Sequence, residues 1–135
     1  MKMLILEKHE IIDWWHKLES YFQTFIDRTN GRENKQILFN KIYQGERSVI
    51  LVLEGEIVRA VLMVVVNDYE LVRECRLIMC AGDKPQDWLH LLEDLKEFVK
   101  SIGCTKLVAE CRPGWEKILE PVGLKKTHVY LEMDI

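Results

Sequence analysis

The most regular part of the sequence is a predicted strand, helix and strand in its second half. A predicted strand from Leu71 to Ala81 finishes in an apolar run, Leu77 to Ala81, that ends at Gly82, and apolar residues then recur at intervals of three and four from Gln86 to Ser101. This spacing places apolar side chains along one stripe of a helix. A further run, from Thr105 to Cys111, predicts a strand that returns parallel to the first. We therefore expect the central helix to cover one face of a sheet.

The loop before the central helix predicts how that helix begins. Asp83 occupies the position of a helix N-cap, and Gln86 follows three residues later, which is the spacing of a capping box. Pro85 fits the first helical turn, where no amide donor is missed. We expect the Asp83 carboxylate to accept a hydrogen bond from a free amide of this turn, most directly that of Gln86.

The rest of the chain also divides into short regular segments. Towards the N-terminus, the pattern predicts a strand, two helices and the two strands of a hairpin, over Met3 to Glu7, His9 to Arg28, Glu33 to Tyr43, Ser48 to Glu54 and Ile57 to Tyr69. Towards the C-terminus, it predicts a short helix from Trp115 to Val122 and a last strand from Leu124 to Ile135. The continuous apolar stretch from Val61 to Val66 is typical of a strand buried on both faces. The predicted fold is α/β, in the order β-α-α-β-β-β-α-β-α-β, with a central mixed sheet of six or seven strands and helices on both faces.

Composition limits the possible partners. At 135 residues and 48% hydrophobic content, the chain fits one domain, residues 1–135, which can bury its own core. Its net charge of -3, without a basic stripe, argues against nucleic acid and against an anionic membrane as partners. No apolar segment is long enough to span a membrane, and four cysteines without metal-ligand spacing argue against a metal site and for a reducing compartment. We expect a soluble, cytoplasmic protein.

The first predicted helix is rich in aromatic residues, which include Trp14, Trp15, Tyr21 and Phe22. Aromatic side chains at helical spacing most often fill a core. The same row, if it were exposed, would suit a protein partner or self-association. The sequence leaves both interpretations open.

The order of the elements resembles the GCN5-related N-acetyltransferase (GNAT) fold over essentially the whole chain. The best local match is Trp115-Glu-Lys-Ile-Leu-Glu-Pro-Val-Gly-Leu124, which is similar to the family's short helix ending in a Gly-aromatic pair. The segment from Cys104 to Leu124, with Arg112-Pro-Gly-Trp115, also resembles short GNAT-like proteins encoded by tailed bacteriophages. The first resemblance implies an acetyl-CoA site, and the second implies a role in a host cytoplasm.

The loop that would hold acetyl-CoA departs from the family pattern. The family carries Arg/Gln-x-x-Gly-x-Gly/Ala there, whose bare amides hold a pyrophosphate at a helix N-terminus. This chain has Cys80-Ala-Gly-Asp-Lys-Pro-Gln-Asp87, with a single glycine. A cofactor, if one is bound, would meet Ala81, Gly82, Lys84 and Gln86. The carboxylates of Asp83 and Asp87 would repel it, so the loop favours a structural helix start and no cofactor.

The general acid that the resemblance implies is also missing. Its tyrosine falls on Leu119, which cannot donate a proton to a departing thiolate. Candidate replacements are Tyr130 as the acid, and Glu74 or Glu110 as a base acting through water. Cys111 could act as a nucleophile, but no histidine lies near it in the sequence, and a buried thiol at a strand end is the simpler interpretation.

Two functions from different classes follow. The first is a GNAT-like protein with a degenerate acetyl-CoA loop, which serves as a non-catalytic interaction or accessory protein. The second is an acyl-CoA-dependent N-acetyltransferase that acts on an amine with a replaced general acid. The absence of both the loop pattern and the acid favours the first, whereas the fold favours the second.

Overall fold

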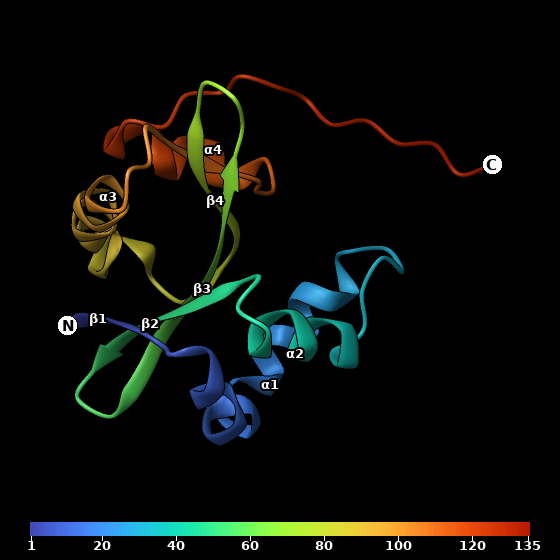
Figure 1. Ribbon diagram of the computed structural model, residues 1–135, viewed down its shortest axis with the longest axis vertical. Coiled ribbons are helices and arrows are strands. Elements are labelled where there is room, and N and C mark those ends of the chain that lie inside the picture. Colours follow the sequence, from blue (N-terminus) through green and yellow to red (C-terminus); the bar gives the residue numbers. More distant parts are fainter.

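The computed structural model describes residues 1–135 and contains one five-stranded mixed sheet (Figure 1). The strands lie in chain order and are β1 (Lys2–Ile5), β2 (Ser48–Glu54), β3 (Ile57–Asp68), β4 (Arg73–Gly82) and β5 (Lys106–Ala109). Strands β1 to β4 pair antiparallel, and β5 lies parallel to β4. The predicted mixed sheet is confirmed, with five strands in place of six or seven.

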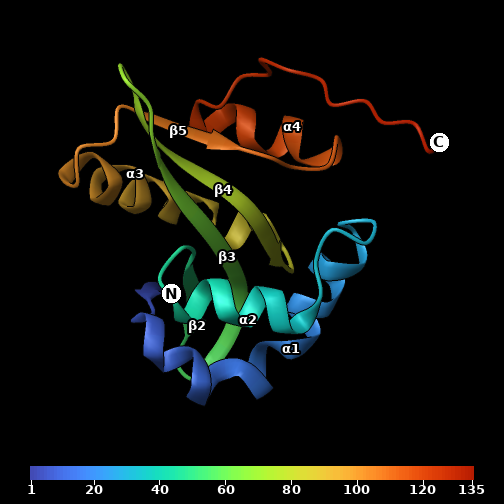
Figure 2. The ribbon, with the colours of Figure 1, turned by 45° about the vertical axis from the view of Figure 1, so that its right-hand side comes forward.

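Helices cover both faces of the sheet, as predicted (Figure 2). They are α1 (Ile11–Asp27), α2 (Lys35–Tyr43), α3 (Leu92–Ser101) and α4 (Gly114–Leu119). Helices α1 and α2 lie on one face, and α3 and α4 lie on the other. Short 3-10 turns precede α1 and follow α4, at Lys8–Glu10 and Glu120–Val122. No helix has the length and apolar character that crossing a membrane requires.

Two layers of core form because successive side chains of a strand point to opposite faces. In β2, Ile50 and Val52 belong to the layer under α3 and α4, whereas Val49 and Leu51 belong to the layer under α1 and α2. The stripe predicted for the central helix is confirmed by the burial of Trp88, Leu92, Leu95 and Val99.

The aromatic row of α1 packs mainly into the second of these layers. Phe22 is fully buried, and the Trp15 ring stacks on it with 4.9 Å between the ring centroids. Trp14 and Tyr21 are half-buried. Core filling therefore accounts for most of the aromatic density that the sequence shows.

The central helix begins later than the sequence predicts. Two 3-10 turns, Pro85–Asp87 and Leu89–Leu91, precede α3. Between them, the side chain of Trp88 is fully buried, and its indole Nε1 donates a hydrogen bond to the Asp83 carbonyl oxygen at 3.0 Å. The prediction that Asp83 caps the helix is wrong, because its carboxylate accepts no hydrogen bond and Lys84 takes a left-handed conformation (φ +48°) before the first turn. Burial of the tryptophan sets the path of this loop.

The prediction of a last strand is also wrong. Residues 124–135 are extended but pair with no strand of the sheet (Figure 1). The alternating pattern gives such a segment two different sides, but it does not specify which strand edge will accept it. The Glu132 carboxylate accepts hydrogen bonds from Asn30 and Arg32, in the connection between α1 and α2, at 2.9 and 2.8 Å.

Candidate functional site

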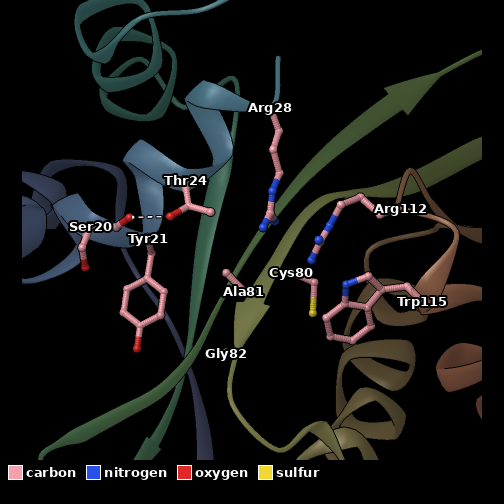
Figure 3. A pocket seen from close by; sticks show the side chains of 9 residues that line it. All are labelled: Ser20, Tyr21, Thr24, Arg28, Cys80, Ala81, Gly82, Arg112 and Trp115. Carbon is pink, nitrogen blue, oxygen red and sulfur yellow. Dashed lines mark hydrogen bonds between the residues drawn. The ribbon is translucent and has the colours of Figure 1, made fainter. Parts of the chain in front are cut away.

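An open cleft of about 440 Å3 lies where β4 and β5 separate (Figure 3). Its nine lining residues come from α1 and the residue after it, from the end of β4, and from the start of α4 and the segment before it. They are Ser20, Tyr21, Thr24, Arg28, Cys80, Ala81, Gly82, Arg112 and Trp115. The cleft therefore joins two parts of the chain that the sequence places far apart.

The cleft exists because β5 ends before β4 does. The last paired residues are Leu77 and Ala109, and the amide of Glu110 makes the final ladder bond, to the Leu77 carbonyl oxygen at 2.9 Å. Strand β4 then continues to Gly82, paired only with β3. Its outer edge over residues 78–82 is left without a neighbouring strand, so backbone donors and acceptors remain open to a ligand.

A β-bulge lies at the point of separation. The register between β3 and β4 runs from Val64 opposite Leu77 to Met63 opposite Met79, so that Ile78 has no counterpart. An extra residue of this kind bends its strand and increases the local twist. The bulge thus directs the end of β4 away from the course of β5.

Two arginines supply the charge of the cleft. Figure 3 shows the guanidinium groups of Arg28 and Arg112 directed toward the end of β4. Neither forms an ion pair, and no carboxylate is among the lining residues. Two uncompensated guanidinium groups favour an anionic ligand, because arginine binds phosphate and carboxylate oxygens through paired hydrogen bonds.

Tyr21 is the only lining residue with a phenol group. Its hydroxyl donates a long hydrogen bond of 3.4 Å to the Val58 carbonyl oxygen of β3, on the face of the sheet that α1 covers. A phenol can donate or accept a proton, so Tyr21 is the lining residue that carries acid chemistry.

The two cysteines nearest the cleft are poor nucleophiles. Burial raises the pKa of the Cys80 thiol to about 12, so the thiol is neutral near pH 7. Cys111 is exposed, so the prediction of a buried thiol at the strand end is wrong; its pKa is still raised, by partial desolvation and then by the charge of Glu116. Because the thiolate is the reactive form, neither residue is activated for covalent catalysis.

None of the three acid and base candidates from the sequence lines the cleft. The Arg76 guanidinium holds Glu74 and Glu110 together, with Nε and Nη1 at 2.9 and 2.7 Å from their carboxylates. Burial raises the pKa of Glu74, but hydrogen bonds from Arg76 and Asn67 outweigh it and lower the pKa below its usual value. Tyr130 is exposed in the unpaired C-terminal segment.

The structure places only some of the predicted cofactor-binding residues in the cleft. Ala81 and Gly82 line the cleft, whereas Lys84 and Gln86 do not. A Cβ on Gly82 would lie 2.5 Å from the Arg59 carbonyl oxygen, so this glycine is required by the close approach of β3.

At the start of the central helix, several backbone amides are already hydrogen-bonded. The amides of Asp87, Trp88 and Leu91 already donate to carbonyl oxygens within the 3-10 turns, at 2.9 to 3.1 Å. The Asp87 carboxylate pairs with Arg59 at 3.3 Å. These three amides are therefore not free to bind a pyrophosphate.

Sequence reasoning missed the residues that give the cleft its chemistry. The sequence gives Arg28 only as the end of a helix, Arg112 only as part of a segment that resembles phage-encoded GNAT-like proteins, and Tyr21 as one member of the aromatic row. No local pattern brings these three residues together, because they meet only when α1 and the segment before α4 fold over the end of β4.

Comparisons in sequence and in structure give different results. No protein-family model matches the chain, and no curated protein matches it significantly in sequence. Among solved structures, it is similar to a probable acetyltransferase, with a TM-score of 0.72 and 13% identity over 100% of this chain and 97% of the other. It is also similar to the ribosomal-protein-alanine N-acetyltransferase from Brucella melitensis biovar Abortus 2308, with a TM-score of 0.72 and 10% identity over 100% of both chains.

A third similar structure is a predicted acetyltransferase with acetyl-CoA from Clostridium acetobutylicum. Its TM-score is 0.66 and its identity 13%, over 98% of this chain and 95% of the other. At these identities the likeness concerns the fold alone. The chain has a GNAT-like fold, as its order of elements predicts.

Proposed function

We propose that this protein is an acyl-CoA-dependent N-acyltransferase whose ligand binds in the cleft between α1 and the separated ends of β4 and β5. The observation that carries the proposal is the open edge of β4 beyond Leu77, beside the unpaired guanidinium groups of Arg28 and Arg112. The GNAT-like fold and the neighbour described with acetyl-CoA support the same ligand class.

The cleft fits the chemistry of an acyl-CoA molecule in two respects. The pantetheine arm of CoA is extended and carries amide groups, which can pair with the free backbone groups of a strand edge as an added strand does. Its phosphates suit the two guanidinium groups. At the helix start, the amides of Asp87, Trp88 and Leu91 are occupied, so Arg28 and Arg112 would take over the binding of phosphate.

The residues of the cleft also suggest how a proton is handled. In N-acyl transfer, a bond forms between the amine nitrogen and the acyl carbon while the carbon–sulfur bond breaks, and the departing thiolate takes up a proton. Tyr21 is the lining residue that can donate this proton. No carboxylate lines the cleft, so the proton released by the amine passes to water.

A turnover assay tests this proposal. The protein is incubated with acetyl-CoA and a panel of primary amines, and acetylated products are sought by mass spectrometry. We expect a product whose rate of formation falls about 100-fold in Tyr21→Phe, as the loss of a general acid predicts. Tyr69→Phe, an exposed position outside the cleft, is the matched control. A loss caused by Tyr130→Phe in place of Tyr21→Phe would assign the acid to the C-terminal segment.

A second candidate function is binding without turnover. It is favoured by Leu119, which stands where the resemblance places the acid and is buried in the core, 4% exposed. In that case acetyl-CoA binds but no amine is acetylated, and the protein acts as an interaction or accessory factor. That the protein is encoded by a bacteriophage, and that a partner binds to the aromatic residues of α1, also remain predictions.

A further inference from the structure

Two free cysteines lie at the point where β4 and β5 separate. Cys80 belongs to β4 and lines the cleft, and Figure 3 shows it on the side where Arg112 and Trp115 lie. Cys111 directly follows Glu110, whose amide makes the last ladder bond between the two strands. The proposed acyl transfer uses neither thiol.

The register brings these two cysteines level with each other. Ala109 is paired with Leu77, so an uninterrupted ladder would place Cys111 opposite the second residue after Leu77. The bulge at Ile78 adds one residue to β4 and so moves Cys80 toward that position. Neighbouring strands lie about 4.8 Å apart, and a disulfide needs about 4.4 to 6.8 Å between its two Cα atoms. Closing the start of the split would therefore bring the two residues into disulfide range.

Both thiols are directed toward the same face of the sheet. Cys80 packs against the core under α3 and α4, as Ala109 does. Glu110 points to the other face, where its carboxylate pairs with Arg76 at 2.7 Å, so alternation returns Cys111 to the face of Cys80. Burial, and then the charge of Cys111, raise the pKa of the Cys80 thiol to about 12, so the two sulfur atoms are near enough to interact.

We propose that Cys80 and Cys111 form a reversible disulfide that closes the split between β4 and β5, with a small anionic disulfide such as oxidised glutathione as the oxidant. The bond draws the chain after β5 toward the edge of β4 over residues 78–82. This is the edge at which the proposed acyl-CoA site lies, so the regulatory consequence rests on the proposed function, although the chemistry does not.

The oxidation proceeds by two exchanges of sulfur partners. The Cys111 thiolate attacks one sulfur of the glutathione disulfide, and the departing glutathione thiolate takes up the proton that Cys111 has lost. The Cys80 thiolate then attacks the Cys111 sulfur of this mixed disulfide, and the second glutathione leaves with the proton from Cys80. Two protein thiols are thereby oxidised to one disulfide, and one glutathione disulfide is reduced to two thiols.

The surroundings of the two cysteines favour this oxidant. The unpaired guanidinium groups of Arg28 and Arg112 line the same cleft, and arginine binds carboxylates such as those of glutathione. Cys111 is exposed and is therefore the thiol that reacts first. Cys75 and Cys104, in contrast, are enclosed in the core, at 0% and 8% exposure. The oxidant therefore reaches only the pair at the cleft.

Peptide mass spectrometry without reductant tests the disulfide in the full chain. The folded protein is incubated with oxidised glutathione at mildly alkaline pH, and the remaining thiols are alkylated. We expect a pair of peptides joined through Cys80 and Cys111. Cys80→Ser should stop at the mixed disulfide on Cys111, Cys111→Ser should form no link, and the matched control Cys104→Ser should link as the wild type does.

Closure of the split is measured on the linked protein. The amides of residues 78–82 should exchange more slowly with solvent than in the reduced chain, whether or not acyl-CoA is the ligand. The binding heat of acetyl-CoA should disappear on oxidation and return with dithiothreitol. If the reduced chain binds no acetyl-CoA, the proposed function fails, while the peptide map and the exchange rates still decide the disulfide.

Three outcomes overturn the proposal. The first is a wild-type chain that keeps glutathione on Cys111 and never forms the link. The second is a link that forms only in urea, because the folded register would then not bring the two thiols together. The third is a linked chain with unchanged exchange at residues 78–82 and unchanged affinity for acetyl-CoA, because the bond would then not close the split.

Discussion

Leu77 and Ala109 are the last paired residues of β4 and β5, and the β-bulge at Ile78 follows directly after this pair. Strand β4 continues beyond it while the chain after β5 turns away toward α4. The open edge, the two cleft arginines and the Tyr21 hydroxyl all lie beyond this point of separation. The position of one ladder end therefore determines where the cleft lies.

Gly82 is expected to tolerate no side chain. A Cβ there would lie 2.5 Å from the Arg59 carbonyl oxygen and 2.7 Å from the Ala60 Cβ, and backbone atoms cannot move aside cheaply. Gly82→Ala should lower the free energy of unfolding by about 1 to 3 kcal/mol. Gly114→Ala, where a Cβ meets nothing within 4 Å, is the control and should cost nothing measurable. Urea denaturation measures both, and equal effects would contradict the close approach of β3.

Trp88, and not Asp83, is expected to hold the loop before α3. Trp88→Phe removes the indole bond to the Asp83 carbonyl oxygen from a fully buried site. It should cost about 1 to 3 kcal/mol of stability. Asp83→Ala should change stability by less than about 0.5 kcal/mol, because the carboxylate makes no hydrogen bond. A larger loss in Asp83→Ala than in Trp88→Phe would restore the capping prediction.

The Glu74 carboxylate should make stability depend on pH. Its pKa is lower in the folded protein than its usual value, so its contribution is present above the unfolded-state pKa and is lost as the pH falls through the folded-state pKa. Glu74→Gln should cost about 1 to 3 kcal/mol at neutral pH.

The difference between wild type and Glu74→Gln should shrink on acidification to below the folded-state pKa. Thermal unfolding across a pH series measures it. Glu97→Gln, at an exposed position of α3, serves as the control. A difference that stays constant, or grows in acid, would show that the hydrogen bonds from Arg76 and Asn67 do not stabilise the charged form.

The cysteines should differ in reactivity in the order of their exposure. Cys111 is exposed, whereas burial raises the pKa of both Cys75 and Cys80 to about 12. Iodoacetamide near neutral pH should therefore label Cys111 first and leave the other two largely unmodified, as peptide mass spectrometry would show. Rapid labelling of Cys80 would reveal a thiolate in the cleft and reopen covalent catalysis.

The sequence predicts the elements of this fold better than their ends and partners. Periodic spacing identifies the buried stripe at Trp88, Leu92 and Leu95, because that stripe faces a sheet wherever the helix begins. It misplaces the start of the helix, since the burial of Trp88 outweighs the capping preference of Asp83. It also assigns a partner to residues 124–135, although alternation fixes only which side of a strand is apolar.

The site could be predicted only where it lies on one segment. Ala81 and Gly82 were found because the resemblance concerns the end of β4 itself. Arg28 and Arg112 were not, because they meet only beyond the separation of β4 from β5, and that separation coincides with a one-residue bulge that has no sequence signal.

The central claim is that acyl-CoA binds beside the open edge of β4. Calorimetric titration of the protein with acetyl-CoA tests it most directly. We expect saturable binding of one molecule per chain, weakened about tenfold by Arg28→Ala and by Arg112→Ala, which corresponds to the loss of one charged hydrogen bond each. Lys96→Ala, an exposed position on α3, should leave it unchanged. The absence of binding heat, together with an unchanged melting temperature at millimolar acetyl-CoA, would contradict the claim.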